Sequence, residues 1–229
     1  MREFLNQNNR NKELIERSLQ TIASVESRTD EYRTAFFNLG EELGLSIKER
    51  YRNLGNTMVA CLNEDADWLT KGLIGKLEGY KISLAVYWSE RVKFSVKPNI
   101  EYAPIIYAYE EPIDNCESLV IVKSIISTSC VVKTQLARLV GRIKPTNIII
   151  AAPVMFKGSD KNLYDSFAKT IADKMEFITF ALDDERDPEG VVIPGIGGWV
   201  FRRLGLGNTI AEVNKFIPEL VKNKILSTE

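Results

Sequence analysis

The sequence predicts an α/β fold: a mainly parallel sheet flanked by helices, with a helical N-terminal region and a C-terminal helical extension. Residues 119–126 and 146–153 are apolar and rich in β-branched side chains, as expected for strands buried on both faces. Residues 127–142 lie between them and have helical apolar spacing, so the three segments form a βαβ unit with parallel strands. The chain accordingly divides into a helical region (1–78), an α/β core (79–207) and a helical extension (208–229).

The N-terminal region carries apolar side chains at helical spacing, which predicts four helices within residues 10–78. Gly44 can end the second helix, and Ser46 with Glu49 has the capping-box spacing that begins a third. Aromatic residues at these spacings indicate a packed core rather than a ligand site. The apolar positions are Leu14, Ile15, Leu19, Ile22 and Val25, then Tyr32, Phe36, Leu39 and Leu43, and finally Trp68, Leu69, Leu73 and Leu77.

The remaining elements follow from alternating strand-like and helical patterns after residue 80. Strands are expected at 82–87, 105–109, 177–182 and 191–193, and a helix at 162–174. An acidic turn spans residues 183–190. Two short C-terminal helices are expected on either side of Pro218, because proline disrupts a helix interior.

Composition limits the class of protein. The chain has 229 residues and a formal net charge of −1, so bulk charge gives no reason to expect nucleic-acid binding. Residues 148–156 form its richest apolar run, which Pro153 interrupts, so we expect no membrane span. No signal peptide is evident at the N-terminus. The scattered cysteines Cys61, Cys116 and Cys130 fit a reduced cytoplasmic setting.

The absence of histidine restricts the possible chemistry. With no histidine in the chain, histidine-based triads, metal sites and general bases are excluded. The cysteines have no metal-ligand spacing. Catalysis would depend on carboxylates, Lys, Arg, Tyr, hydroxyls or a metal held by oxygen ligands, and the sequence singles out no catalytic residue.

Hydroxyl side chains follow the buried strand at 119–126, where the next helix begins. Ser127, Thr128 and Ser129 lie at this helix N-terminus, which can bind phosphate through its unpaired N–H groups and dipole. Ligands in open α/β sheets collect at the carboxyl ends of strands. The alternative is that these hydroxyls only cap the helix.

A glycine-rich segment at 191–207 reads Val-Val-Ile-Pro-Gly-Ile-Gly-Gly-Trp-Val-Phe-Arg-Arg-Leu-Gly-Leu-Gly. Glycines let backbone N–H and C=O groups approach a flat ligand closely. Arg202 and Arg203 are candidates for contacting a phosphate, a carboxylate or a partner, or for lying on a solvated surface. The segment indicates a nucleotide-type pocket, although most such loops are turns.

The order of these segments resembles the uracil phosphoribosyltransferases, which have the type I phosphoribosyltransferase fold. The resemblance runs through residues 119–128, 148–153, 180–183 and 190–197, and ends at Arg202. The family has an Ala-Ala-Pro strand end, an Ala-x-Asp strand and a Gly-Tyr-Ile-Val-Pro-Gly-Leu-Gly-Asp loop that reads uracil through backbone atoms. The resemblance therefore implies base-loop candidates at Ile193, Gly195, Gly197 and Arg202.

The chain departs from the family where phosphoribosyl pyrophosphate would bind. The family's loop reads Asp-Pro-Met-Leu-Ala-Thr-Gly-Gly-Ser, whereas residues 123–131 here are Lys-Ser-Ile-Ile-Ser-Thr-Ser-Cys-Val, which keep only Thr128. Lys123 cannot accept the ribose hydrogen bonds that the family's carboxylate accepts. Ser129 and Cys130 replace glycines and carry Cβ atoms that penalise positive φ. Glu90 lies roughly where the pyrophosphate loop would fall and would repel pyrophosphate.

These departures favour a phosphoribosyltransferase-like pseudoenzyme that lacks standard uracil salvage activity. It would sense a nucleotide or bind a partner as a subunit of a larger assembly, for example in stress or defence. Lys123 would then pair with a phosphate, and Asp183 or Asp184 would hold a ribose. The alternative is a divergent transferase that uses phosphoribosyl pyrophosphate on a pyrimidine base or nucleotide and would need Mg²⁺. The resemblance also implies a homo-oligomer or a protein partner, and a vestigial pocket on a scaffold remains a third reading.

Overall fold

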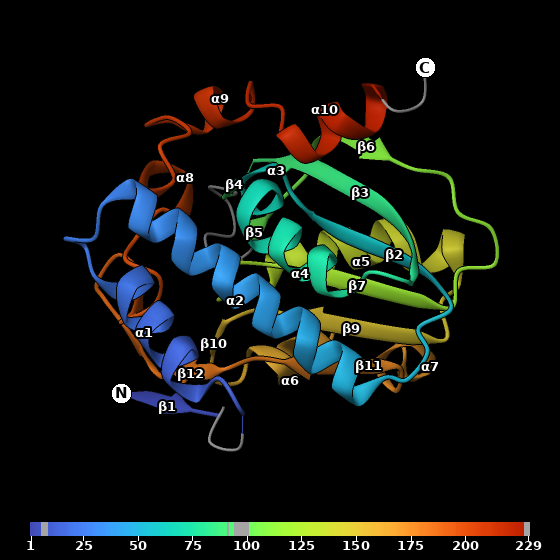
Figure 1. The fold of residues 1–229 in the computed structure, drawn as a ribbon, viewed down its shortest axis with the longest axis horizontal. Coiled ribbons are helices and arrows are strands. Elements are labelled where there is room, and N and C mark those ends of the chain that lie inside the picture. The colour runs from blue at the N-terminus through green and yellow to red at the C-terminus, as the bar shows by residue number, and fades with distance from the viewer. Residues whose placement is uncertain (6–8, 91, 94–100, 227–229) are drawn as a thin grey trace.

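The fold class predicted from the sequence is confirmed: the chain is α/β, with a mainly parallel sheet flanked by helices (Figure 1). The structure is a computed structural model and describes residues 1–5, 9–90, 92–93 and 101–226. In chain order the elements are β1 (Arg2–Phe4), α1 (Lys12–Ala23), α2 (Thr29–Arg50), β2 (Asn56–Leu62), α3 (Asn63–Asp65), the π-helix η1 (Ala66–Thr70), α4 (Lys71–Lys76), β3 (Lys81–Ser89), β4 (Val92–Lys93), β5 (Glu101–Tyr102), β6 (Ile105–Glu110), β7 (Ser118–Val122), β8 (Ile125–Ile126), α5 (Cys130–Ile143), β9 (Asn147–Ala151), β10 (Val154–Phe156), α6 (Ser159–Tyr164), α7 (Lys169–Ala172), β11 (Met175–Ile178), β12 (Ala181–Asp183), β13 (Glu185–Arg186), β14 (Val192–Ile193), α8 (Val200–Arg203), α9 (Ile210–Val213) and α10 (Glu219–Leu226).

The main sheet has the strand order β11-β9-β7-β2-β3-β6. Its first five strands are parallel, and β6 pairs antiparallel with β3. The predicted βαβ unit is present, because β7 and β9 are parallel neighbours joined through α5. A second sheet of order β1-β12-β10-β8 extends from the carboxyl ends of the main strands, with only β1 antiparallel to its neighbour.

Helices cover both faces of the main sheet, with α2 and α4 on one face and α5 on the other (Figure 1). Strand β2 shows how the sequence provides for this arrangement, because alternate side chains point to opposite faces of a strand. Val59 and Cys61 pack in the core beneath α2 and α4, whereas Met58 and Ala60 pack in the core beneath α5. Both faces of the central strand are therefore buried and apolar.

The predicted break in the N-terminal helices at Gly44 is wrong, because α2 continues to Arg50. A Cβ built on Gly44 would lie 2.5 Å from the Leu73 carbonyl oxygen, so this glycine allows α2 and α4 to pack closely instead of ending the helix. Ser46 lies inside α2, where its hydroxyl donates to the Glu42 carbonyl at 2.8 Å. It therefore begins no third helix.

The expectation of helices throughout residues 10–78 is also wrong, because β2 lies within that range. This strand pairs with β3 on one side and β7 on the other, at the middle of the sheet. The predicted strand at 119–126 is divided into β7 and β8, and the one at 177–182 into β11 and β12. The predicted helix at 162–174 is two short helices, α6 and α7.

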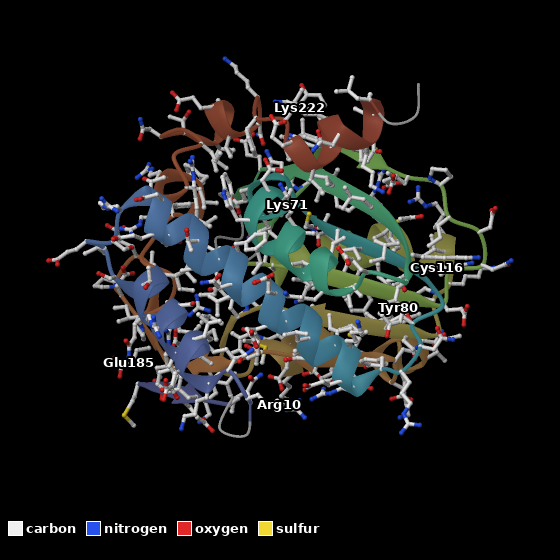
Figure 2. The ribbon with its side chains drawn as sticks, in the orientation of Figure 1. Arg10, Lys71, Tyr80, Cys116, Glu185 and Lys222 are labelled. Carbon is white, nitrogen blue, oxygen red and sulfur yellow. The ribbon has the colours of Figure 1, made fainter. Side chains whose placement is uncertain are left out.

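The C-terminal extension forms α9 and α10, which are separated near Pro218 as predicted. Backbone N–H groups at the start of α10 donate to the Asp67 carboxylate, both at 2.9 Å. The Trp88 indole donates to the Phe216 carbonyl at 2.8 Å. In Figure 2 Lys222 marks α10 along the edge of the molecule beside β3. The extension therefore packs on its own domain.

Replacing Gly40 with alanine is expected to lower the free energy of unfolding by about 1–3 kcal/mol, the usual cost of overpacking. A Cβ at this position in α2 would lie 2.1 Å from the Leu69 carbonyl oxygen, so the two segments must separate. Urea denaturation measures the effect. Gly75→Ala in α4 is the matched control, since that Cβ meets nothing within 4 Å and alanine favours a helix. Equal stability of both variants would contradict the expected clash.

Candidate functional site

A cleft of about 530 Å³ lies at the carboxyl ends of β2, β3 and β7. Its walls come from the ends of these three strands, the loop between β7 and α5, the hairpin segment (residues 185–201) and the start of the C-terminal extension. Ligands of open α/β sheets bind outside the carboxyl ends of the strands. The position of the cleft therefore makes it the candidate ligand site.

Lys123 lies in the cleft wall directly after β7, and its ammonium group is almost fully enclosed. Its Nζ lies 2.7 Å from Asp65 Oδ2, 3.1 Å from Glu64 Oε1 and 2.8 Å from Ser124 Oγ. Asp65 also accepts the Ser124 backbone N–H at 3.1 Å. Burial disfavours the charged form of Lys123, but the two carboxylates outweigh burial and raise its pKa.

This cluster bears on the predicted phosphate role of Lys123. An ammonium group has three protons, and the three partners within the structure match them. A phosphate would have to displace one of these partners. The geometry therefore favours a structural role for Lys123, as the cation of a buried ion cluster, over a role as a phosphate ligand.

The loop before α5 keeps a backbone shape that normally requires glycine. Ser129 has φ of 62°, in the left-handed region, despite carrying a side chain. Its hydroxyl donates to the Ser159 carbonyl at 3.0 Å and makes no cap hydrogen bond to the first turn of α5. Ser129 is buried and lies outside the cleft lining, so its predicted phosphate contact would come only from its backbone.

Ser127 and Thr128, two of the predicted phosphate-binding residues, both line the cleft. The Ser127 carbonyl accepts hydrogen bonds from the Ser159 hydroxyl at 2.6 Å and from Arg186 Nη2 at 3.3 Å, which fixes the loop. The Thr128 hydroxyl oxygen is buried and has no hydrogen-bond partner among the described residues. A buried polar atom without a partner is costly, and a bound anion or water would satisfy it.

The ribose candidates Asp183 and Asp184 do not reach the cleft lining. Asp183 is fully buried and forms a bidentate pair with Arg2, at 2.8 Å from Nε and 2.7 Å from Nη2. It also accepts the Gly195 N–H at 2.9 Å. Asp184 pairs with the N-terminal amine of Met1. Both carboxylates therefore hold the N-terminal end of the chain beside β12, and Asp183 also holds the hairpin segment.

The base-loop candidates are divided between structural and peripheral positions. Gly195 is bonded to Arg2 and Asp183, and Gly197 has φ of 68° at a point where a Cβ would lie 2.7 Å from the Ile22 carbonyl oxygen. Arg202 Nε donates to the Asn208 carbonyl at 3.0 Å. None of these residues, nor Ile193, lines the cleft, whereas their neighbours in the hairpin segment do.

Two side chains that the sequence did not single out define the outer wall of the cleft. Arg186 stacks 4.0 Å above the Phe156 ring and donates to the Gly190 carbonyl at 3.0 Å. Trp199 lines the cleft with 49% of its surface exposed. Figure 2 places Glu185, where the hairpin segment begins, beside β1. An exposed aromatic side chain in a cleft wall offers a stacking surface for a flat ligand.

Asn63 was also missed, and it joins the cleft to the C-terminal extension. It is buried directly after β2, and its amide donates to the Val213 carbonyl at 2.7 Å and the Phe216 carbonyl at 3.4 Å. Ile210 and Val213 complete the cleft wall. A short apolar run between Gly55 and the polar residues after Leu62 was the available signal for this strand end.

Within the described ranges, no group of three or more His, Cys, Asp or Glu side chains is placed to hold a metal ion. None of the helices in that part of the chain is both long and apolar enough to cross a membrane.

No protein-family model matches the chain, and no curated protein matches it either. Among solved structures, the AQ2163 protein from Aquifex aeolicus aligns with a TM-score of 0.66 at 15% identity, over 83% of this chain and 93% of that one. This likeness shows a shared fold alone. TT1426 from Thermus thermophilus aligns at a TM-score of 0.46 and 13% identity, over 78% of this chain and 94% of that one. A hypoxanthine phosphoribosyltransferase from Staphylococcus aureus aligns at a TM-score of 0.42 and 15% identity, over 54% of this chain and 65% of that one. The last two scores are too low to argue from.

Proposed function

We propose that this chain is a phosphoribosyltransferase-like protein that binds a nucleotide or nucleobase in the cleft and does not carry out standard uracil salvage. In this proposal it acts in the cytoplasm, as a nucleotide-sensing or partner-binding subunit of an oligomer or larger assembly. Its ancestry is inferred from the uracil phosphoribosyltransferase resemblance over residues 119–202 and from the cleft at the carboxyl ends of the strands.

The observation that carries the proposal is the ion cluster at the end of β7. The family's carboxylate for the ribose diol would occupy the position of Lys123, and here the ammonium group is bound to Glu64 and Asp65. A lysine cannot accept the diol hydrogen bonds. Charge-assisted hydrogen bonds contribute about 1.5–3 kcal/mol each, so their loss lowers turnover by orders of magnitude.

Retained ligand binding is supported by two features of the cleft. The Thr128 hydroxyl is buried without a partner among the described residues, beside the start of α5, where the Ser129 side chain makes no cap hydrogen bond and N–H groups and the helix dipole favour an anion. The apolar and aromatic wall of the hairpin segment suits a planar base. A vestigial pocket would have no need to keep either feature.

A divergent transferase that uses phosphoribosyl pyrophosphate is the second candidate. The observation in its favour is Ser129, which keeps the left-handed backbone that the family's glycine provides. A phosphate-wrapping loop could therefore persist without glycine at this position. Such an enzyme would require Mg²⁺ with its diphosphate substrate.

We expect the purified protein to bind UMP or AMP and to release no pyrophosphate from phosphoribosyl pyrophosphate and uracil. Calorimetry measures the binding, and a coupled pyrophosphate assay with and without Mg²⁺ measures the reaction. Thr128→Val should weaken nucleotide binding without lowering the melting temperature, since the hydroxyl has no hydrogen-bond partner in the part of the chain that the structure describes. Pyrophosphate release would support the transferase, whereas failure of every nucleobase, nucleoside and nucleotide tested would leave a scaffold.

A further inference from the structure

Some charged side chains around the cleft are bound to other groups of the protein and others are not. This difference determines which ligand the cleft can bind. The described part of the lining holds two cations, Lys123 and Arg186, and three carboxylates, Glu64, Glu90 and Glu189. A ligand with several phosphates needs free cations or a metal ion to offset its charge. The question is therefore which of these side chains can face a ligand.

Both cations are held by groups of the protein. Lys123 is bound to Asp65, Glu64 and Ser124, which match its three protons. Arg186 lies over the Phe156 ring and donates to the carbonyls of Gly190 and Ser127. Neither side chain reaches a second phosphate without breaking these contacts.

Two of the carboxylates are not paired with a cation or a hydrogen-bond donor of the described residues. Within the described residues, the side chains of Glu90 and Glu189 make no hydrogen bond or ion pair, and both are exposed at the cleft. Glu90 follows β3, and Glu189 lies in the hairpin segment. Like charges at close range repel even in a watery environment.

The order of the strands determines where these carboxylates lie relative to the start of α5, where the anion would bind. Lys123 follows β7, Glu64 follows β2 and Glu90 follows β3, and these strands are adjacent in that order. Thr128 follows β8, the next strand along the chain after β7. Neighbouring strands lie about 4.8 Å apart. A second phosphate directed from Thr128 across these strand ends would approach Glu64 and then Glu90, and Glu189 also lines the cleft.

We infer that the cleft selects a ligand with a single phosphate, a nucleoside monophosphate or similar phosphomonoester, and discriminates against diphosphates and triphosphates. This inference rests on the proposed function. The phosphate lies at the Thr128 hydroxyl and the start of α5, and the remainder of the ligand lies along the apolar and aromatic wall. The uncompensated carboxylates act as the selectivity element.

Calorimetry in EDTA at constant ionic strength tests the inference with UMP, UDP and UTP, and in parallel with AMP, ADP and ATP. In whichever base series binds, the monophosphate should bind at least about tenfold more tightly than the diphosphate, which corresponds to about 1.4 kcal/mol. Glu90→Gln should strengthen diphosphate binding several-fold and change monophosphate binding less than twofold. Glu26→Gln, exposed in the turn between α1 and α2 outside the cleft lining, is the matched control and should change neither.

The outcomes separate the inference from the proposed function. Diphosphates that bind as tightly as monophosphates would overturn the selectivity and leave nucleotide binding in place. Equal behaviour of Glu90→Gln and Glu26→Gln would remove Glu90 from its assigned role and overturn the carboxylate argument. If no nucleobase, nucleoside or nucleotide binds, both the proposed ligand binding and this inference fail.

Discussion

The Lys123→Met protein is expected to lose about 3–5 kcal/mol of unfolding free energy, the usual cost of removing one partner of a buried ion pair. Asp65 is almost fully buried, and without the ammonium group it and Glu64 lose their shared cation. Guanidinium denaturation measures the loss. Lys71→Met is the matched control, since Lys71 is an exposed lysine at the surface in Figure 2, and its stability should change by less than about 0.5 kcal/mol.

The pH dependence of this difference follows from the raised pKa of Lys123, in which the carboxylates of Asp65 and Glu64 outweigh burial. A lysine with a raised folded pKa stabilises fully below its unfolded pKa of about 10.4. The stabilisation is lost as pH rises through the higher folded pKa. The difference in unfolding free energy between wild type and Lys123→Met should therefore be constant from pH 7 to 9, as far as it depends on Lys123, and should shrink above about pH 10.4. A stable variant that instead loses nucleotide affinity would make Lys123 a phosphate ligand.

The Arg2→Met protein should likewise lose about 3–5 kcal/mol, because it leaves the buried Asp183 carboxylate without its cation. Among the described residues, only the Gly195 N–H would then donate to the Asp183 carboxylate. Chemical denaturation measures the loss, and hydrogen exchange at Gly195 should become faster as the hairpin segment loosens. Arg10→Met, at the exposed arginine marked in Figure 2, is the matched control. A loss below about 1 kcal/mol in Arg2→Met would contradict the structural role of the pair.

The sequence predicted those parts of the fold that depend on local patterns. Strands 82–87 and 105–109, the helix after residue 127 and the break at Pro218 all follow from spacing and proline chemistry. Strand β2 was missed because a short apolar run within a helical region has no period that distinguishes strand from helix. Gly44 was misread because close helix packing and helix termination both use glycine.

The candidate site was predictable only where it depends on chain order. Ser127 and Thr128 reach the cleft because a strand followed by a helix places its loop at the carboxyl edge. The carboxylate partners of Lys123 lie 58 and 59 residues earlier, and Arg2 lies 181 residues before Asp183. No local pattern indicates such pairings, because the sheet topology creates them. A carboxylate beside a glycine loop therefore suggested a ribose contact where the fold forms an ion pair.

The exposed indole of Trp199 gives the protein an intrinsic fluorescence reporter at the cleft. The chain has three tryptophans. Trp68 lies beneath Arg33, and Trp88 is 6% exposed with its indole bonded to Phe216, so both are shielded from a ligand. Trp199 alone among them lines the cleft. Quenching of its emission can therefore be titrated directly at low protein concentration, and acrylamide access can report whether the cleft is filled, without any label.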